Sequence, residues 1–185
     1  QRINAYWKKF LLGEKTGIDL PGEIRGLLPE PEEKEERTGR PWLVGDTYNI
    51  SIGQGDLLIT PLQLIDSIAA IANKGQLYRP HIAHDNRSPS LLADLSAFAS
   101  DMVHVERGMR DAVTEQYGTA HLLADLPVSV AAKTGSAQIS NNTKTNAFFV
   151  GYIPTTRSGM DNGSRIAILI LVEHSKEGSL NAVPI

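Results

Sequence analysis

The stretch VAAKTGSAQIS, residues Val130 to Ser140, decides the fold that the sequence predicts. It lies in a region rich in β-branched residues, which favours a β-strand. In a strand, Lys133 and Gly135 share one face and Thr134 takes the other. A glycine inside a strand lets a ligand or another backbone approach closely. The strand is therefore suited to form one wall of a binding cleft.

The residues around this strand predict a small antiparallel sheet. Polar turns at residues 140–143 and 158–163 separate three segments rich in β-branched and aromatic residues, which we predict as strands: Val128–Ile139, Asn146–Ile153 and Arg165–Glu173. Helices come first along the chain and this meander follows, which indicates the α+β class, with an antiparallel sheet flanked by helices.

Residues 1–127 are predicted to contain mostly helices and loops. A helix over about Arg2–Leu12 ends at Gly13, which suits the left-handed conformation of a helix end. The clearest helix opens at Thr60-Pro61, with threonine as the N-cap and proline at the first helical position, and Gly75 closes it. A further helical region ends before Gly118 and contains Met102, Val105, Met109 and Val113.

Three other segments carry no strong helical pattern. Pro29–Arg40 reads PEPEEKEERTGR and lacks an apolar anchor, so we predict a solvated loop. Trp42–Ile52 alternates loosely between apolar and polar residues. Gly53-Gln54-Gly55 lacks the third glycine of a dinucleotide fingerprint and the Gly-Lys-Ser/Thr of a phosphate loop, so we interpret it as a tight backbone bend.

The composition excludes several classes of function. Hydrophobic residues make up 41% and charged residues 21% of the chain, as in an ordinary globular domain. The net charge of −3 gives no basic surface for nucleic acid, and no apolar run is long enough to cross a membrane. There is no cysteine, and His81 and His84 lack a third ligand nearby, so neither a metal site nor a cofactor is expected.

The tripeptide Lys-Thr-Gly occurs twice, and its context separates the two copies. Lys15-Thr16-Gly17 follows a predicted helix and leads into turn residues, whereas Lys133-Thr134-Gly135 lies in a predicted strand. A Lys-Thr-Gly strand is one of three elements of the serine enzymes that react with penicillin, together with S-x-x-K and S-x-N. Only the second copy is therefore a candidate for chemistry.

Several segments in the same order resemble one known family. They are GEKTGIDLPGE, WLVGDTYNISIGQG, TPLQLIDSIAAIANKGQLYRPHI, GMRDAV with GTA, AAKTGSAQ, NAFFVGYIP and VEHSKEGSLNAVPI. Their order and spacing resemble those of class B penicillin-binding proteins, most closely the elongation-specific branch, penicillin-binding protein 2, whose members are peptidoglycan D,D-transpeptidases. The resemblance covers nearly the whole chain. It implies a partial transpeptidase fold of the serine β-lactamase type.

The resemblance also implies roles for the residues of the strand. Lys133 would add positive charge to the cleft and join the proton-transfer network around the nucleophile. Thr134 and Ser136 would hydrogen-bond the terminal carboxylate of a D-Ala-D-Ala stem peptide or of a β-lactam. Gly135 would keep the strand open to the ligand, and the Ser136 backbone N–H would be one oxyanion donor. Gln138 would contact the acyl group, or would only face solvent.

Two family motifs have no counterpart here. The sequence contains no S-x-x-K, and its two S-x-N strings, Ser140-Asn141-Asn142 and Ser179-Leu180-Asn181, follow the Lys-Thr-Gly instead of preceding it, so we interpret both as turns. We therefore expect residues 1–185 to be the C-terminal portion of one transpeptidase domain and to be inactive alone. Ser136 replaces the usual threonine, and Asn146 stands where Gram-negative members commonly have histidine.

The parent protein is expected at the periplasmic face of the bacterial inner membrane, anchored through residues outside this chain, with the cell-elongation machinery as its partner. Two alternatives remain open at this point. A β-lactamase or D,D-carboxypeptidase shares the Lys-Thr-Gly strand but passes the acyl group to water. A non-catalytic binding module would use the same surface without chemistry.

Overall fold

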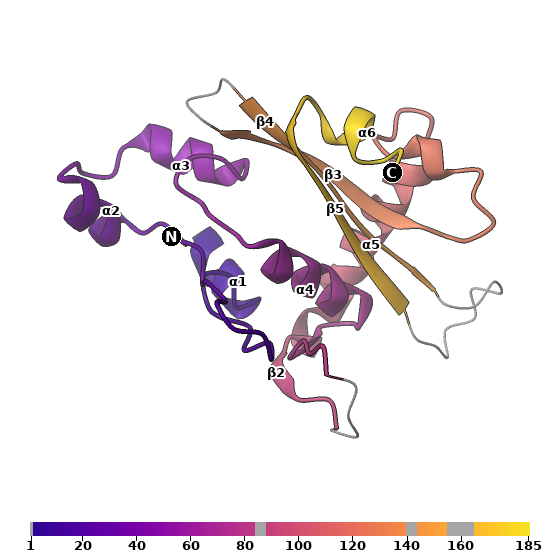
Figure 1. The fold of residues 1–185 in the computed structure, drawn as a ribbon, viewed down its shortest axis with the longest axis horizontal. Coiled ribbons are helices and arrows are strands. Elements are labelled where there is room, and N and C mark those ends of the chain that lie inside the picture. The colour runs from indigo at the N-terminus through magenta and orange to yellow at the C-terminus, as the bar shows by residue number, and fades with distance from the viewer. Residues whose placement is uncertain (1, 84–87, 140–143, 155–164) are drawn as a thin grey trace. The chain divides into compact units, whose positions relative to one another are not determined.

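The computed structural model describes residues 2–83, 88–139, 144–154 and 165–185. The chain divides into two compact units, the first made of residues 1–63 and 78–93 and the second of residues 64–77 and 94–185. Figure 1 shows the elements of both units. His84, the two predicted turns and the string Ser140-Asn141-Asn142 lie outside the described residues, wholly or in part.

The second unit contains the predicted sheet. Its strands are β3 (Ala131–Ile139), β4 (Lys144–Pro154) and β5 (Arg165–Ser175), in the order β3-β4-β5 with both pairs antiparallel. The three-stranded meander and the α+β class are therefore confirmed. Because β4 is central, β3 is an edge strand of this sheet, and half of its backbone polar groups point away from β4.

Apolar residues pack on both faces of this sheet. Ala131, Val150 and Tyr152 pack on one face with Ile68 and Ala72 of α4 (Pro61–Ala72) and Met109 of α5 (Ala99–Thr114). The other face holds Ala132, Phe149, Val113 of α5 and the residues after α6 (Gly178–Asn181), Ala182 and Val183. The alternation of β3 thus divides its side chains between two cores.

The α4 N-terminus forms as the sequence predicts. The hydroxyl of Thr60 accepts a hydrogen bond from the Gln63 N–H, and the Gln63 side chain accepts one from the Thr60 N–H, both at 3.1 Å. This is a capping box with glutamine at the third helical position. The same Gln63 side chain donates to the carbonyls of Glu14 and Arg25, at 2.5 and 2.9 Å, so it also fixes two loops of the first unit.

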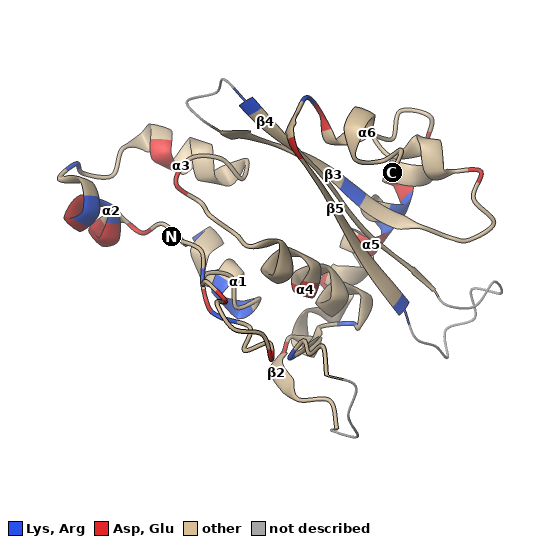
Figure 2. Cartoon of the chain, viewed as in Figure 1, with Lys and Arg blue, Asp and Glu red and all other residues tan. Residues whose placement is uncertain are grey.

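The prediction of a loop over Pro29–Arg40 is wrong, because residues Pro31–Thr38 form a helix, α2. Proline opens it, two glutamates occupy its first turn, and Gly39 closes it in the left-handed conformation with φ 68°. Arg37 also bridges Glu33 and Asp56, at 2.9 and 2.7 Å. Local capping and ion pairs therefore stabilise a helix that has no buried residue. Figure 2 shows that charges are dense on α2 and sparse on β3, β4 and β5.

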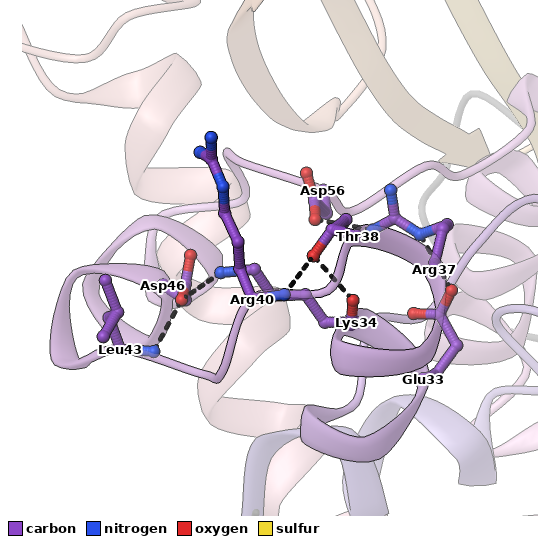
Figure 3. Close-up of polar contacts among 8 residues, drawn as sticks. All are labelled: Glu33, Lys34, Arg37, Thr38, Arg40, Leu43, Asp46 and Asp56. Atoms are coloured by element: carbon purple, nitrogen blue, oxygen red, sulfur yellow. Dashed lines mark hydrogen bonds and ion pairs between the residues drawn. The ribbon is translucent and has the colours of Figure 1, made fainter.

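A polar cluster joins α2 to the next helix, α3 (Val44–Ser51) (Figure 3). The Lys34 ammonium lies 2.5 Å from Asp46, whose carboxylate also accepts the N–H of Leu43 at 2.7 Å. Trp42 lies 5.8 Å below the same ammonium. Hydrogen bonds from Lys34 and Leu43 hold the pKa of Asp46 below its usual value.

Other elements are short. The first unit begins with α1 (Arg2–Lys9), which ends before the predicted Leu12, although Gly13 is left-handed as expected. Gly53 and Gly55 also have positive φ, which confirms the predicted bend. β1 (Gln76–Tyr78) and β2 (Leu91–Asp94) pair in a small sheet that the sequence did not predict. The described residues also contain the 3-10 turns η1 (Ser96–Phe98) and η2 (His121–Leu123).

Candidate active site

The second Lys-Thr-Gly lies in the middle of the edge strand β3. Lys133, Ser136 and Gln138 are exposed, Gly135 is half-buried and Thr134 is buried. In the pairing with β4, Lys133 lies opposite Val150, Thr134 opposite Phe149 and Gly135 opposite Phe148. Ser136 lies opposite Ala147 and Gln138 opposite Thr145. All the predicted site residues thus lie within six consecutive positions of one strand, but their side chains are divided between its two faces.

Lys133 belongs to the face that also carries Ala131. Its ammonium donates to the carbonyl of the next residue, Thr134, and the structure describes no carboxylate partner for it. Because its side chain is exposed, the positive charge is open to solvent, and no described ion pair neutralises it. Such a charge can attract an anionic ligand to this edge.

Thr134 lies on the opposite face, next to Val130 and Ala132 in the alternation of the strand. Its hydroxyl is hydrogen-bonded to the hydroxyl of Thr119 at 2.8 Å. Thr119 comes from the turn that follows α5, fifteen residues earlier. The sequence singled out the segment Gly118-Thr119-Ala120 only as part of the resemblance and gave Thr119 no role.

Ser136 shares the face of Thr134 and contacts the start of α6. Its hydroxyl accepts the N–H of Gly178 at 3.3 Å. Gly178 is buried, and a methyl group on its Cα would lie 2.5 Å from the Gly135 carbonyl oxygen. Asn181 fixes the same segment, because its side-chain oxygen accepts the N–H groups of Lys176 and Glu177 at 3.3 and 3.2 Å. Ser179-Leu180-Asn181 is therefore part of a short helix that packs on the candidate strand.

Comparisons with known proteins identify the family. Residues 1–185 match the penicillin binding protein transpeptidase domain over the whole chain. The chain belongs to the penicillin-binding protein transpeptidase family.

Individual transpeptidases of this family support the predicted branch. Over 96% of its own length, the chain is 30% identical to the peptidoglycan D,D-transpeptidase MrdA of Acinetobacter baumannii. Over its whole length, it is 30% identical to MrdA of Haemophilus influenzae. It covers 29% and 31% of those proteins. The chain thus spans about a third of the length of the curated transpeptidases that it matches.

Solved transpeptidase structures have the same fold. The Helicobacter pylori penicillin-binding protein PBP2, solved in complex with MreC, matches 96% of this chain with a TM-score of 0.83 and 34% identity. Pseudomonas aeruginosa PBP2 in complex with WCK 5153 matches 99% with a TM-score of 0.82 and 30% identity. The chain covers 32% and 41% of those two structures. The resemblance to penicillin-binding protein 2 and the fold class are confirmed.

Asn146, one of the two positions where the sequence analysis noted a departure, has a defined contact. The Asn146 side-chain oxygen accepts the N–H of His174 at 3.2 Å. The pairing of β4 with β5 shifts register between Thr145 and Ala147, and His174 has a left-handed φ of 53°. Asn146 therefore stabilises a β-bulge across from the end of the candidate strand.

The first Lys-Thr-Gly of this transpeptidase family member has a structural contact network. The Glu23 carboxylate accepts both the N–H and the hydroxyl of Thr16 at 2.6 Å, and the N–H of Gly17 at 3.0 Å. Burial opposes ionisation of Glu23, but these hydrogen bonds hold its pKa below the usual value. Lys15 lines an open groove of about 570 Å³, mostly apolar, in the first unit. This groove thus lies at the first copy, away from the strand that carries the second copy.

The described residues contain no group of three metal-ligating side chains. His81 contacts the carbonyl of Ala83 at 3.0 Å, and His84 lies outside the described residues. Within the same ranges, no helix is both long and apolar enough to cross a membrane.

Proposed function

We propose that this chain supplies the Lys-Thr-Gly wall of a peptidoglycan D,D-transpeptidase that works through a serine acyl-enzyme. The observation that carries the proposal is the edge strand β3, which holds Lys133, Thr134 and Ser136 together, in a chain that belongs to the transpeptidase family. The sequence contains no S-x-x-K. The serine and its activating lysine would therefore be contributed by residues outside these 185, with this chain as the C-terminal portion of the domain.

The reaction would proceed in two steps. The serine oxygen attacks the carbonyl of the penultimate D-alanine, an ester bond forms, and the C–N bond to the terminal D-alanine breaks. The departing amine takes a proton from the network that includes Lys133. An amine of a neighbouring stem then attacks the ester, an amide bond forms and the C–O bond to the serine breaks. The proton that the amine loses passes to the serine oxygen, which restores the free serine.

Each strand residue would contribute one element of this chemistry. The Lys133 ammonium would hold positive charge near the substrate carboxylate, and the Thr134 and Ser136 hydroxyls would hydrogen-bond it. The Ser136 N–H would stabilise the oxyanion, a contribution worth about 3 kcal/mol in activation free energy. Gly135 would allow close approach, since a methyl group on its Cα would meet only the Phe148 side chain, at 3.7 Å. Gln138 would lie near the acyl group.

The relatives of the chain support a proposal for the location and partners of the parent protein. MrdA proteins are named peptidoglycan D,D-transpeptidases, one matched structure is a complex with MreC, and another is a peptidoglycan synthase complex. We therefore propose that the parent works at the periplasmic face of the inner membrane, within the cell-elongation machinery. Its ligands would be D-Ala-D-Ala stem peptides and β-lactams.

Acylation by a labelled penicillin tests this proposal. The 185-residue chain is incubated with the label and its intact mass is measured. We expect no covalent adduct, whereas the parent polypeptide, with an S-x-x-K segment joined to these residues, gains one penicillin. A stable adduct on the short chain, or no adduct on the parent, contradicts the proposal.

A further inference from the structure

The proposed reaction uses Thr134 but assigns no role to Thr119, whose hydroxyl is hydrogen-bonded to that of Thr134. Thr134 is only 9% exposed and Thr119 is exposed. Their hydroxyl oxygens are 2.8 Å apart, the usual separation for an O–H···O hydrogen bond. Because Thr134 is buried, few water molecules compete for its hydroxyl, and Thr119 sets its orientation.

The backbone on both sides of Thr119 is fixed. A methyl group on the Cα of Gly118 would lie 2.2 Å from the carbonyl oxygen of Ala112, so the turn packs tightly against the end of α5. Ala120 is fully buried, and its N–H donates to the same carbonyl at 2.9 Å. Thr119 is thus held between two anchored residues, and its side chain is presented to β3 without a loop rearrangement.

The direction of the hydrogen bond decides what Thr134 can do. A hydroxyl has one proton and two acceptor lone pairs. When Thr134 donates to Thr119, only its lone pairs are left, and these repel a carboxylate. When Thr119 donates instead, the Thr134 proton is available to a carboxylate. The two arrangements differ by rotation of two O–H bonds, with both oxygen atoms in the same place.

We propose that Thr119 is a positioning residue for carboxylate recognition. It donates its proton to the Thr134 hydroxyl, and Thr134 then donates to the terminal carboxylate of the stem peptide or β-lactam. This inference rests on the proposed function, because it assumes that Thr134 meets that carboxylate. The inference gives Thr119 an effect on the binding of carboxylate ligands. If Thr119 served only as a hydrogen-bond partner for the buried Thr134 hydroxyl, its replacement would change folding stability alone.

The test uses the parent polypeptide that carries the S-x-x-K segment. The second-order acylation rate is measured with a penicillin and with the methyl ester of the same penicillin, which lacks the negative charge. We expect Thr119→Val to lower the rate about tenfold, or ~1.4 kcal/mol, for the free acid only. Thr119→Ser keeps the hydroxyl and should restore the wild-type rate. Thr114→Val is the matched control, because it removes an exposed hydroxyl that donates to the Arg110 carbonyl and lies in α5, outside the candidate strand.

The outcomes separate this inference from the proposed function. A wild-type parent that is not acylated by either probe overturns the proposed function and, with it, the role of Thr119. A wild-type parent that is acylated, with Thr119→Val slowed equally for both probes or for neither, overturns the role of Thr119 alone. Thr119→Ala replaces the valine variant if a thermal melt shows that valine disturbs the turn, and it is judged by the same comparison of the two probes.

Discussion

Replacement of Gly178 by alanine tests how α6 is held against the candidate strand. A methyl group on the Cα of Gly178 would lie 2.4 Å from the Phe148 carbonyl oxygen and 2.5 Å from that of Gly135. Both atoms belong to the backbone of paired strands, so neither can move aside as a flexible side chain would. The φ of Gly178 is not in the left-handed region, so the expected effect is purely steric.

The cost follows from what must move. Relief of the two contacts requires α6 to rise from the sheet, which exposes Ala182 and Val183, now 0% and 5% exposed. The hydrogen bond from the Gly178 N–H to Ser136 would be lost as well. Overpacking of this kind usually costs about 1–3 kcal/mol, and we expect the upper part of that range. For a chain of this size that corresponds to a fall in Tm of roughly 5–10 °C.

Urea unfolding followed by circular dichroism measures the change. Gly108→Ala is the matched control, because Gly108 lies in α5 and a methyl group there would have no atom within 4 Å. That variant should be more stable than wild type by up to about 1 kcal/mol, since alanine is the better helix former. A Gly178→Ala protein within about 0.5 kcal/mol of wild type would refute the steric reasoning.

Three further predictions concern the first unit. The pKa of Glu23 is lowered in the folded chain, so its contribution to stability is complete above the ordinary glutamate pKa and is lost as pH falls through the folded value. Glu23→Gln should therefore weaken the dependence of Tm on pH in the acid range. An unchanged dependence would contradict the Thr16 contacts as its cause. Gln63→Leu removes the capping box and leaves two carbonyls without their donor, and should cost at least about 2 kcal/mol in urea unfolding. Lys34→Met should speed amide hydrogen exchange in α2 with little change in Tm, because α2 has no buried residue; equal exchange rates would show that the ion pair does not hold the helix.

The elements that were predicted correctly carry their signals within a few residues. The Thr60-Pro61 start of α4 needs only the chemistry of the N-cap and of the third helical position. The three strands are long and rich in β-branched residues, so the tertiary structure changed their ends by no more than three residues. The first Lys-Thr-Gly was correctly placed in a loop because a helix ends shortly before it and turn residues follow.

The two helices that the sequence did not predict, α2 and α3, have a weak or misleading hydrophobic pattern. The α2 sequence has no apolar stripe, so only its terminal residues and its ion pairs indicate a helix. In α3, Ile50 is buried while Val44 and Tyr48 are exposed, as is Ile52 directly after the helix, and the apolar residues therefore do not mark a single buried face. Prediction of a helix from hydrophobic periodicity assumes that the apolar residues are buried, and in α3 most of them are exposed.

The sequence by itself determined the family, the α+β class and the strand that carries Lys133, Thr134 and Ser136, because each depends on local patterns and on their order along the chain. Only the tertiary structure decided which groups those side chains meet. Thr119 reaches Thr134 across 15 residues, and Gly178 reaches Ser136 across 42. Neither contact has a local signal, since it arises when the turn after α5 and the start of α6 pack against the same face of the sheet.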